Sequence, residues 1–87
     1  MHLKKELLAS WRSQRGRYWV DLYAEQLEGC APAFSYSADN GGGFIGHCAP
    51  EVAIQHAARQ AGFGPSKCNR TYFNADLADK LCKETNQ

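Results

Sequence analysis

Histidine and cysteine are the side chains of this chain best suited to catalysis or to metal binding. His47 and Cys48 are adjacent, His56 follows in the next segment and Cys68 lies further along. A cysteine beside a histidine can act as an activated nucleophile, and four such ligands can hold a zinc ion. Neighbours on a strand point to opposite faces, however, and the chain has no C-x-x-C or H-x-x-x-H spacing. We therefore interpret Cys48 as a packed cysteine; a small zinc-binding domain is a less favoured alternative, and a Cys-His hydrolase is favoured still less.

Three glycines, Gly41, Gly43 and Gly46, match the G-x-G-x-x-G fingerprint of dinucleotide-binding proteins letter for letter. That motif requires a preceding strand, a helix that opens on the glycines and an acidic residue about 20 positions later. Here a strand is expected to run through Phe44 and Ile45. The glycines therefore indicate a hairpin tip at which the backbone can come close to a partner, and no cofactor is expected.

The set with the clearest binding chemistry is basic and aromatic and lies in the first third of the sequence. It comprises Lys4, Lys5, Trp11, Arg12, Arg15, Arg17, Tyr18, Trp19 and Tyr23. Arginine binds phosphates or carboxylates through a rigid fork, and Trp and Tyr supply a large contact area at low entropic cost. The set suits a protein interface or nucleic acid. The structural alternative is that Trp11 and Tyr18 belong to the core and that the lysines are merely solvated.

Length and composition indicate a single small domain, residues 1–87, with 44% hydrophobic and 22% charged residues. The net charge of +1 is too small to indicate a nucleic-acid or membrane partner by itself. No apolar run is long enough for a signal peptide or a membrane span, so we expect an intracellular, cytoplasmic protein with no membrane partner. In that compartment the four cysteines should be reduced, with two disulfides or metal ligation as alternatives.

A β-hairpin that runs into a helix is expected to organise the fold. The apolar runs Phe34–Ala38 and Gly43–Cys48 flank the sequence DNGG, whose Asn-Gly pair favours a tight turn. Pro50 suits the first position of a helix that we expect to end near Ala61. The alanine-rich face of this helix should allow it to lie across the strands.

The remaining elements have weaker signals. Leu7, Leu8 and Trp11 share a helical face, which predicts an amphipathic helix over residues 2–13. Residues 17–23 alternate as a strand, which is the preferred interpretation, and a long N-terminal helix is the alternative. Residues 62–73 are expected to form a loop. Asn74 is a suitable N-cap for a last helix of about ten residues.

Together these elements predict an α+β fold with an N-terminal helix, a three-stranded antiparallel sheet and two C-terminal helices. The order helix, three strands, helix also occurs in double-stranded RNA-binding domains. In that family the second helix begins with a lysine cluster that grips phosphates, whereas this chain has Pro50, Glu51 and Val52 there. The shared order of elements therefore does not predict RNA binding.

The sequence favours a non-enzymatic binding protein that regulates or inhibits a protein partner or complex. Its size and its lack of a catalytic motif are also found in phage and mobile-element inhibitors such as anti-CRISPR proteins, an analogy of size only. Nucleic-acid binding through the basic N-terminal segment is the alternative. The expected interface joins that segment, the hairpin tip and the loop after the central helix. Its residues are Arg12, Arg15, Arg17, Trp19, Asn40, Gly42, Lys67 and Arg70.

Overall fold

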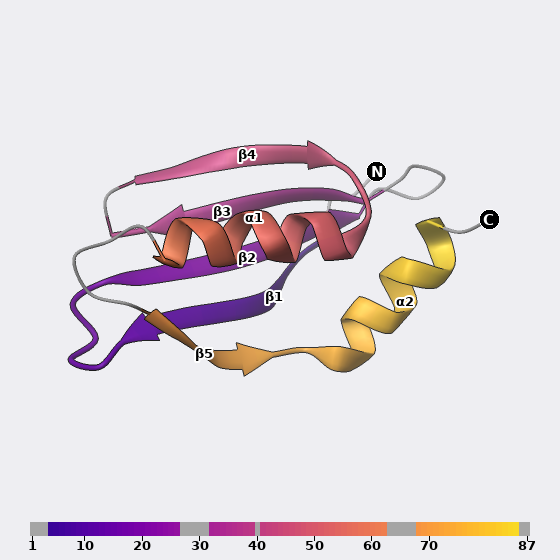
Figure 1. The fold of residues 1–87 in the computed structure, drawn as a ribbon. Coiled ribbons are helices and arrows are strands. Elements are labelled where there is room, and N and C mark those ends of the chain that lie inside the picture. Colours follow the sequence, from indigo (N-terminus) through magenta and orange to yellow (C-terminus); the bar gives the residue numbers. More distant parts are fainter. Residues whose placement is uncertain (1–3, 27–31, 40, 63–67, 86–87) are drawn as a thin grey trace.

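The structure, a computed structural model, describes residues 4–26, 32–39, 41–62 and 68–85. Figure 1 shows a sheet with one helix lying across it and a second helix at its end. The elements in chain order are β1 (Lys4–Ser13), β2 (Trp19–Gln26), β3 (Ala33–Ala38), β4 (Gly41–His47), α1 (Pro50–Gly62), β5 (Cys68–Phe73) and α2 (Ala75–Thr85). The fold is α+β, but the predicted arrangement of an N-terminal helix before a three-stranded sheet is wrong.

The sheet has five strands in the order β4-β3-β2-β1-β5. Strands β1 to β4 form an antiparallel meander in which each strand pairs with the next. Strand β5 then returns and pairs antiparallel with the other side of β1, from Ala9↔Phe73 to Ser13↔Cys68. Strands β4 and β5 are therefore the two edges of the sheet (Figure 1).

The segment predicted to be the N-terminal helix is strand β1. Its register with β2 shifts between Leu7 and Ala9, so Leu8 is an extra, bulged residue. In a regular strand, Leu8 and Trp11 would point to opposite faces, but the bulge lets both reach the core. The strand therefore buries two apolar residues with the spacing that is typical of a helical face.

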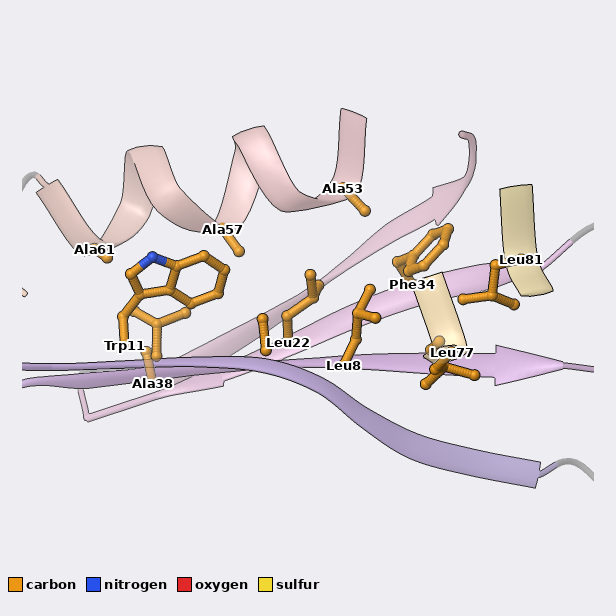
Figure 2. Packing of buried hydrophobic residues seen from close by; sticks show 13 residues of the cluster. Leu8, Trp11, Leu22, Phe34, Ala38, Ala53, Ala57, Ala61, Leu77 and Leu81 are labelled. Carbon is orange, nitrogen blue, oxygen red and sulfur yellow. The ribbon is translucent and has the colours of Figure 1, made fainter. Parts of the chain in front are cut away.

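Helix α1 lies close to one face of the sheet because the side chains it turns towards the strands are small. Ala53, Ala57 and Ala61 recur along one side of the helix and are buried (Figure 2). Larger side chains from the sheet fill the space below, with Trp11 beneath the C-terminal half of the helix and Phe34 towards Ala53 (Figure 2). The predicted helix that begins at Pro50 is confirmed, with its end at Gly62.

Helix α2 packs on the same side of the sheet as α1. Leu77 and Leu81 belong to the hydrophobic core, beside Leu8 and Phe34 (Figure 2). Asn74 caps this helix, because its Oδ1 accepts a hydrogen bond from the Leu77 amide at 3.1 Å. The predicted N-cap is therefore confirmed. In the described part of the chain, no helix is both long and apolar enough to cross a membrane.

Three predictions about the strands have different outcomes. The hairpin is confirmed, because β3 and β4 pair antiparallel. The preferred interpretation of residues 17–23 as a strand is confirmed, although the bounds differ, because β2 covers Trp19–Gln26. The predicted loop over residues 62–73 is wrong in its second half, where Cys68–Phe73 form β5. Nearly all β5 side chains are exposed, so the strand lacks an alternating burial pattern and depends on its pairing with β1.

Candidate binding surface

One face of the sheet carries the helices and the other is left uncovered by the described elements. In β2, Val20, Leu22 and Ala24 are buried beneath α1, whereas Trp19 and Tyr23 are only half-buried. Because successive side chains of a strand point to opposite faces, these two aromatic residues project away from α1. Core residues of both helices lie on the other side of the strands (Figure 2). We call this surface the open face; its side chains include Lys5, Arg12, Trp19, Asp21, Tyr23, Glu25, Phe44 and Tyr72.

The two edge strands also place aromatic side chains on the open face. Phe44 of β4 pairs with Ser35 of β3, which pairs in turn with Tyr23. Residues paired across antiparallel strands share a face, so Phe44 projects on the same side as Tyr23. Tyr72 of β5 pairs with Ser10 of β1, whose side chain lies on the open face, so Tyr72 projects on this face as well. Phe44 is 69% exposed and Tyr72 is 44% exposed, so a large apolar area contacts solvent here.

The guanidinium of Arg12 is held on the open face by three contacts. Its Nη1 donates hydrogen bonds to Asp21 Oδ1 at 2.8 Å and to the Trp11 carbonyl oxygen at 2.9 Å. The guanidinium also lies 5.6 Å from the centre of the Trp19 ring. The charge of Arg12 is therefore largely compensated within the protein. Because its side chain is already fixed, less entropy is lost when a partner binds beside it.

A second cation is compensated in the same way towards the other end of β1. Lys5 Nζ lies 4.0 Å from Glu25 Oε1 and 4.7 Å from the centre of the Tyr23 ring. A surface ion pair of this kind contributes at most about 1 kcal/mol to stability. Its larger effect is on the charge of the surface. The open face presents paired, mutually compensated charges beside aromatic rings.

The turn between β1 and β2 carries two arginines in a different environment. Ser13 closes this turn, because its amide donates to the Tyr18 carbonyl at 2.9 Å and its hydroxyl accepts from the Tyr18 amide at 3.1 Å. Gly16 supplies the positive φ of 74° that the turn requires. Arg15 and Arg17 are therefore held outside the sheet, where both are exposed.

Strand β5 brings a third arginine to this end of the molecule. Cys68 pairs with Ser13 at the base of the turn, and Arg70 follows on the same strand, opposite Trp11. Arg70 is also exposed. Among the residues that the structure describes, no carboxylate lies within ion-pair distance of these three arginines. We call the set Arg15, Arg17 and Arg70 the basic corner.

The tip of the β3–β4 hairpin lies at the same end of the sheet. Asp39 Oδ1 accepts a hydrogen bond from the Trp19 amide at 3.0 Å, and the Asp39 amide donates to the Trp19 carbonyl at 3.2 Å. Gly41 has a φ of +121°. Gly42 is packed so closely that a Cβ would lie 2.5 Å from the Tyr36 carbonyl oxygen. The glycines therefore serve the turn and the close approach of β4 to β3, and β3 separates them from β2.

The structure brings most of the predicted interface residues to one end of the sheet. Those in the described part of the chain are Arg12, Arg15, Arg17, Trp19, Gly42 and Arg70. Asn40 and Lys67 lie outside the described residues. The prediction omitted Phe44 and Tyr72, the exposed aromatic residues that the edge strands place on the open face. Phe44 and Ile45 are consecutive apolar residues of one strand, so their side chains point to opposite faces. The sequence alone does not say which of the two faces solvent.

The histidines and cysteines of the described segments do not gather into one site. No group of three or more His, Cys, Asp or Glu side chains in these segments is placed to hold a metal ion. His47 ends β4, whereas His56 belongs to α1. Burial raises the pKa of the Cys48 thiol, and burial together with the nearby charge of Asp39 raises that of Cys68. Raised thiol pKa values lower the thiolate fraction at neutral pH, which is opposite to what a nucleophilic cysteine needs.

No protein-family model matches the chain, and no curated protein or solved structure matches it significantly. Any functional conclusion therefore depends on the open face and the basic corner themselves.

Proposed function

We propose that this chain is a non-enzymatic binding protein that regulates or inhibits a protein partner by docking the open face against it. The observation that supports this proposal is the combination of uncovered aromatic side chains with internally compensated charges on one face of the sheet. Trp, Tyr and Arg are the residues most often found at the energetic centres of protein interfaces. On this face Arg12 is stacked on Trp19 and hydrogen-bonded to Asp21.

The charge pattern favours a protein over a nucleic acid as the occupant of the open face. A phosphate backbone is bound by cations that are free to replace its counterions. Here Arg12 and Lys5 are paired with Asp21 and Glu25, whose carboxylates would repel phosphates. A protein surface with apolar groups and a few complementary charges suits this pattern better, because the aromatic area supplies most of the binding energy.

A capture experiment with matched variants tests the role of the open face. Tagged protein is used to capture partners from extract, and the complex is then reconstituted from purified components. The double variant Phe44→Asp/Tyr72→Asp should weaken the reconstituted complex by at least about tenfold, because it replaces the most exposed aromatic side chains at both edges of the open face with charges. The control is Val52→Asp on α1, an apolar residue that is 52% exposed and lies away from the open face.

Equal binding by the double variant and the control would show that the open face is not the interface. Circular dichroism of each variant establishes that the fold is retained before binding is compared. Labelled single-stranded DNA and RNA are titrated in parallel. If these oligonucleotides bind more tightly than any captured protein and lose affinity steeply with salt, the protein is a nucleic-acid-binding module and the proposal is wrong.

A further inference from the structure

We infer that the basic corner binds an extended, acidic segment of the partner, beside the surface that contacts the open face. This inference rests on the proposed function and adds the chemistry of one part of the partner. Its basis is the contrast between two sets of cations on the same molecule. Arg12 and Lys5 have acidic partners, whereas the structure shows none for the basic corner within its described residues.

Two of the three arginines of the basic corner are supported by aromatic rings, which position them without neutralising them. The Arg17 guanidinium lies 5.7 Å from the centre of the Tyr18 ring, and that of Arg70 lies 4.7 Å from the centre of the Phe73 ring. A stacked guanidinium keeps its edge free, and that edge matches the two oxygens of a carboxylate. These arginines are therefore suited to carboxylates supplied by another chain.

The arrangement of the basic corner favours an extended ligand. Strand β5 is an edge of the sheet, so a chain can run along its outer side, and the strand carries no acidic residue. Arg70 lies two residues beyond Cys68, which pairs with Ser13 at the base of the arginine turn. Two residues of strand span about 7 Å, the distance between alternate side chains of an extended peptide. A segment that runs along β5 towards Cys68 therefore passes Arg70 and then the base of the arginine turn, so carboxylates spaced along it can contact first one and then the other.

A short acidic peptide fits this corner better than a nucleic acid does. Single-stranded nucleic acid is bound along a continuous basic groove. Asp39 lies at the hairpin tip at the same end of the sheet and Asp21 lies on the open face, so carboxylates interrupt the basic surface towards the other strands. A segment with a few discrete carboxylates avoids these two charges. The occupant we propose is therefore a peptide segment with glutamate or aspartate at alternate positions.

The test uses the full chain and a fluorescein-labelled decapeptide of alternating glutamate and threonine, followed by fluorescence anisotropy at low salt. A decapeptide of alternating lysine and threonine and an oligo-dT of the same length are the comparison probes. The acidic peptide should bind, and the lysine peptide should not. Arg17→Glu should weaken binding about fivefold, and Arg15→Glu/Arg17→Glu/Arg70→Glu should abolish it. Lys80→Glu on α2 is the matched single-charge control and should bind as the unmodified protein does, because it is exposed and lies outside the corner.

Amide chemical shifts identify where the peptide binds. The acidic peptide should perturb the amides of Asn69, Arg70 and the β1–β2 turn and leave that of Phe44 unchanged. Equal binding of the acidic and lysine peptides, no binding of either, or an equal loss in Arg17→Glu and Lys80→Glu would overturn the inference. Tighter binding of oligo-dT than of the acidic peptide would overturn it in favour of a phosphate site. The Phe44→Ser variant, on the opposite edge strand β4, adds no charge and should still bind the peptide while it weakens the partner complex, so failure of this inference and failure of the proposed function give different results.

Discussion

Gly42 shows how one residue without a side chain holds an edge strand in place. A Cβ at this position would lie 2.5 Å from the Tyr36 carbonyl oxygen and 3.2 Å from the Ser37 Cα. Both neighbours are backbone atoms of β3, so they cannot move aside as a flexible side chain would. The close approach of β4 to β3 therefore depends on glycine here, and this approach fixes the position of Phe44 on the open face.

Gly42→Ala should lower the free energy of unfolding by about 1 to 3 kcal/mol, because the added methyl group forces the two strands apart. Phe44→Ala on the same strand is the control and should change stability by less than about 0.5 kcal/mol, since its side chain is largely exposed. Urea denaturation followed by circular dichroism measures both. A Gly42→Ala protein as stable as the control would show that β4 can shift without cost.

The start of α2 is determined by Asn74, which links β5 to the helix. The Asn74 side chain caps the helix through the Leu77 amide at 3.1 Å, and the Asn74 amide donates to the Leu8 carbonyl at 2.8 Å. Asn74→Ala removes the first bond and leaves the second, so it should destabilise the protein by about 1 kcal/mol. Asn69→Ala on β5 makes the same chemical change at an exposed position and should have little effect. Thermal denaturation of the two variants compares them; equal melting temperatures would contradict the capping role.

The elements that could be predicted from the sequence are those whose signals are local. The hairpin is indicated by its Asn-Gly turn, and α1 by Pro50 and the spacing of its alanines. Each of these signals lies within a short stretch of sequence. Strand β1 could not be predicted, because the bulge at Leu8 gives a strand the apolar spacing of a helix. Strand β5 has no burial pattern of its own and forms through pairing with β1, a contact between distant parts of the sequence.

The residue types of the candidate surface could be predicted from the sequence, but their positions relative to one another could not. The basic and aromatic residues around Arg12 and Trp19 are visible in the sequence as a cluster. Their separation into a balanced open face and an unbalanced corner depends on cross-strand pairing, which places Asp21 beside Arg12 and Arg70 near the arginine turn. Neither neighbour can be identified without the register of the strands.

At the scale of the whole molecule, the two surfaces should differ in their response to salt. For the reconstituted partner complex, the dissociation constant of the unmodified protein should rise between about 50 and 200 mM salt, because the basic corner contributes unpaired charge. Arg17→Glu should weaken the complex at low salt and flatten this dependence. Phe44→Ser should weaken the complex equally at every salt concentration, because the interaction it removes is apolar. Parallel salt curves for the two variants would contradict the division into two kinds of surface.

The pairing of β1 with β5 determines when the sheet can be completed during folding. The hairpins from β1 to β4 join neighbouring segments and can close early, whereas Ala9 and Phe73 must meet across most of the chain. Until β5 arrives, β1 is an edge strand with an unpaired row of backbone amides and carbonyls and with Leu8 and Trp11 incompletely covered. Aggregation during synthesis or refolding should therefore begin at β1, although this strand lies inside the sheet of the finished protein.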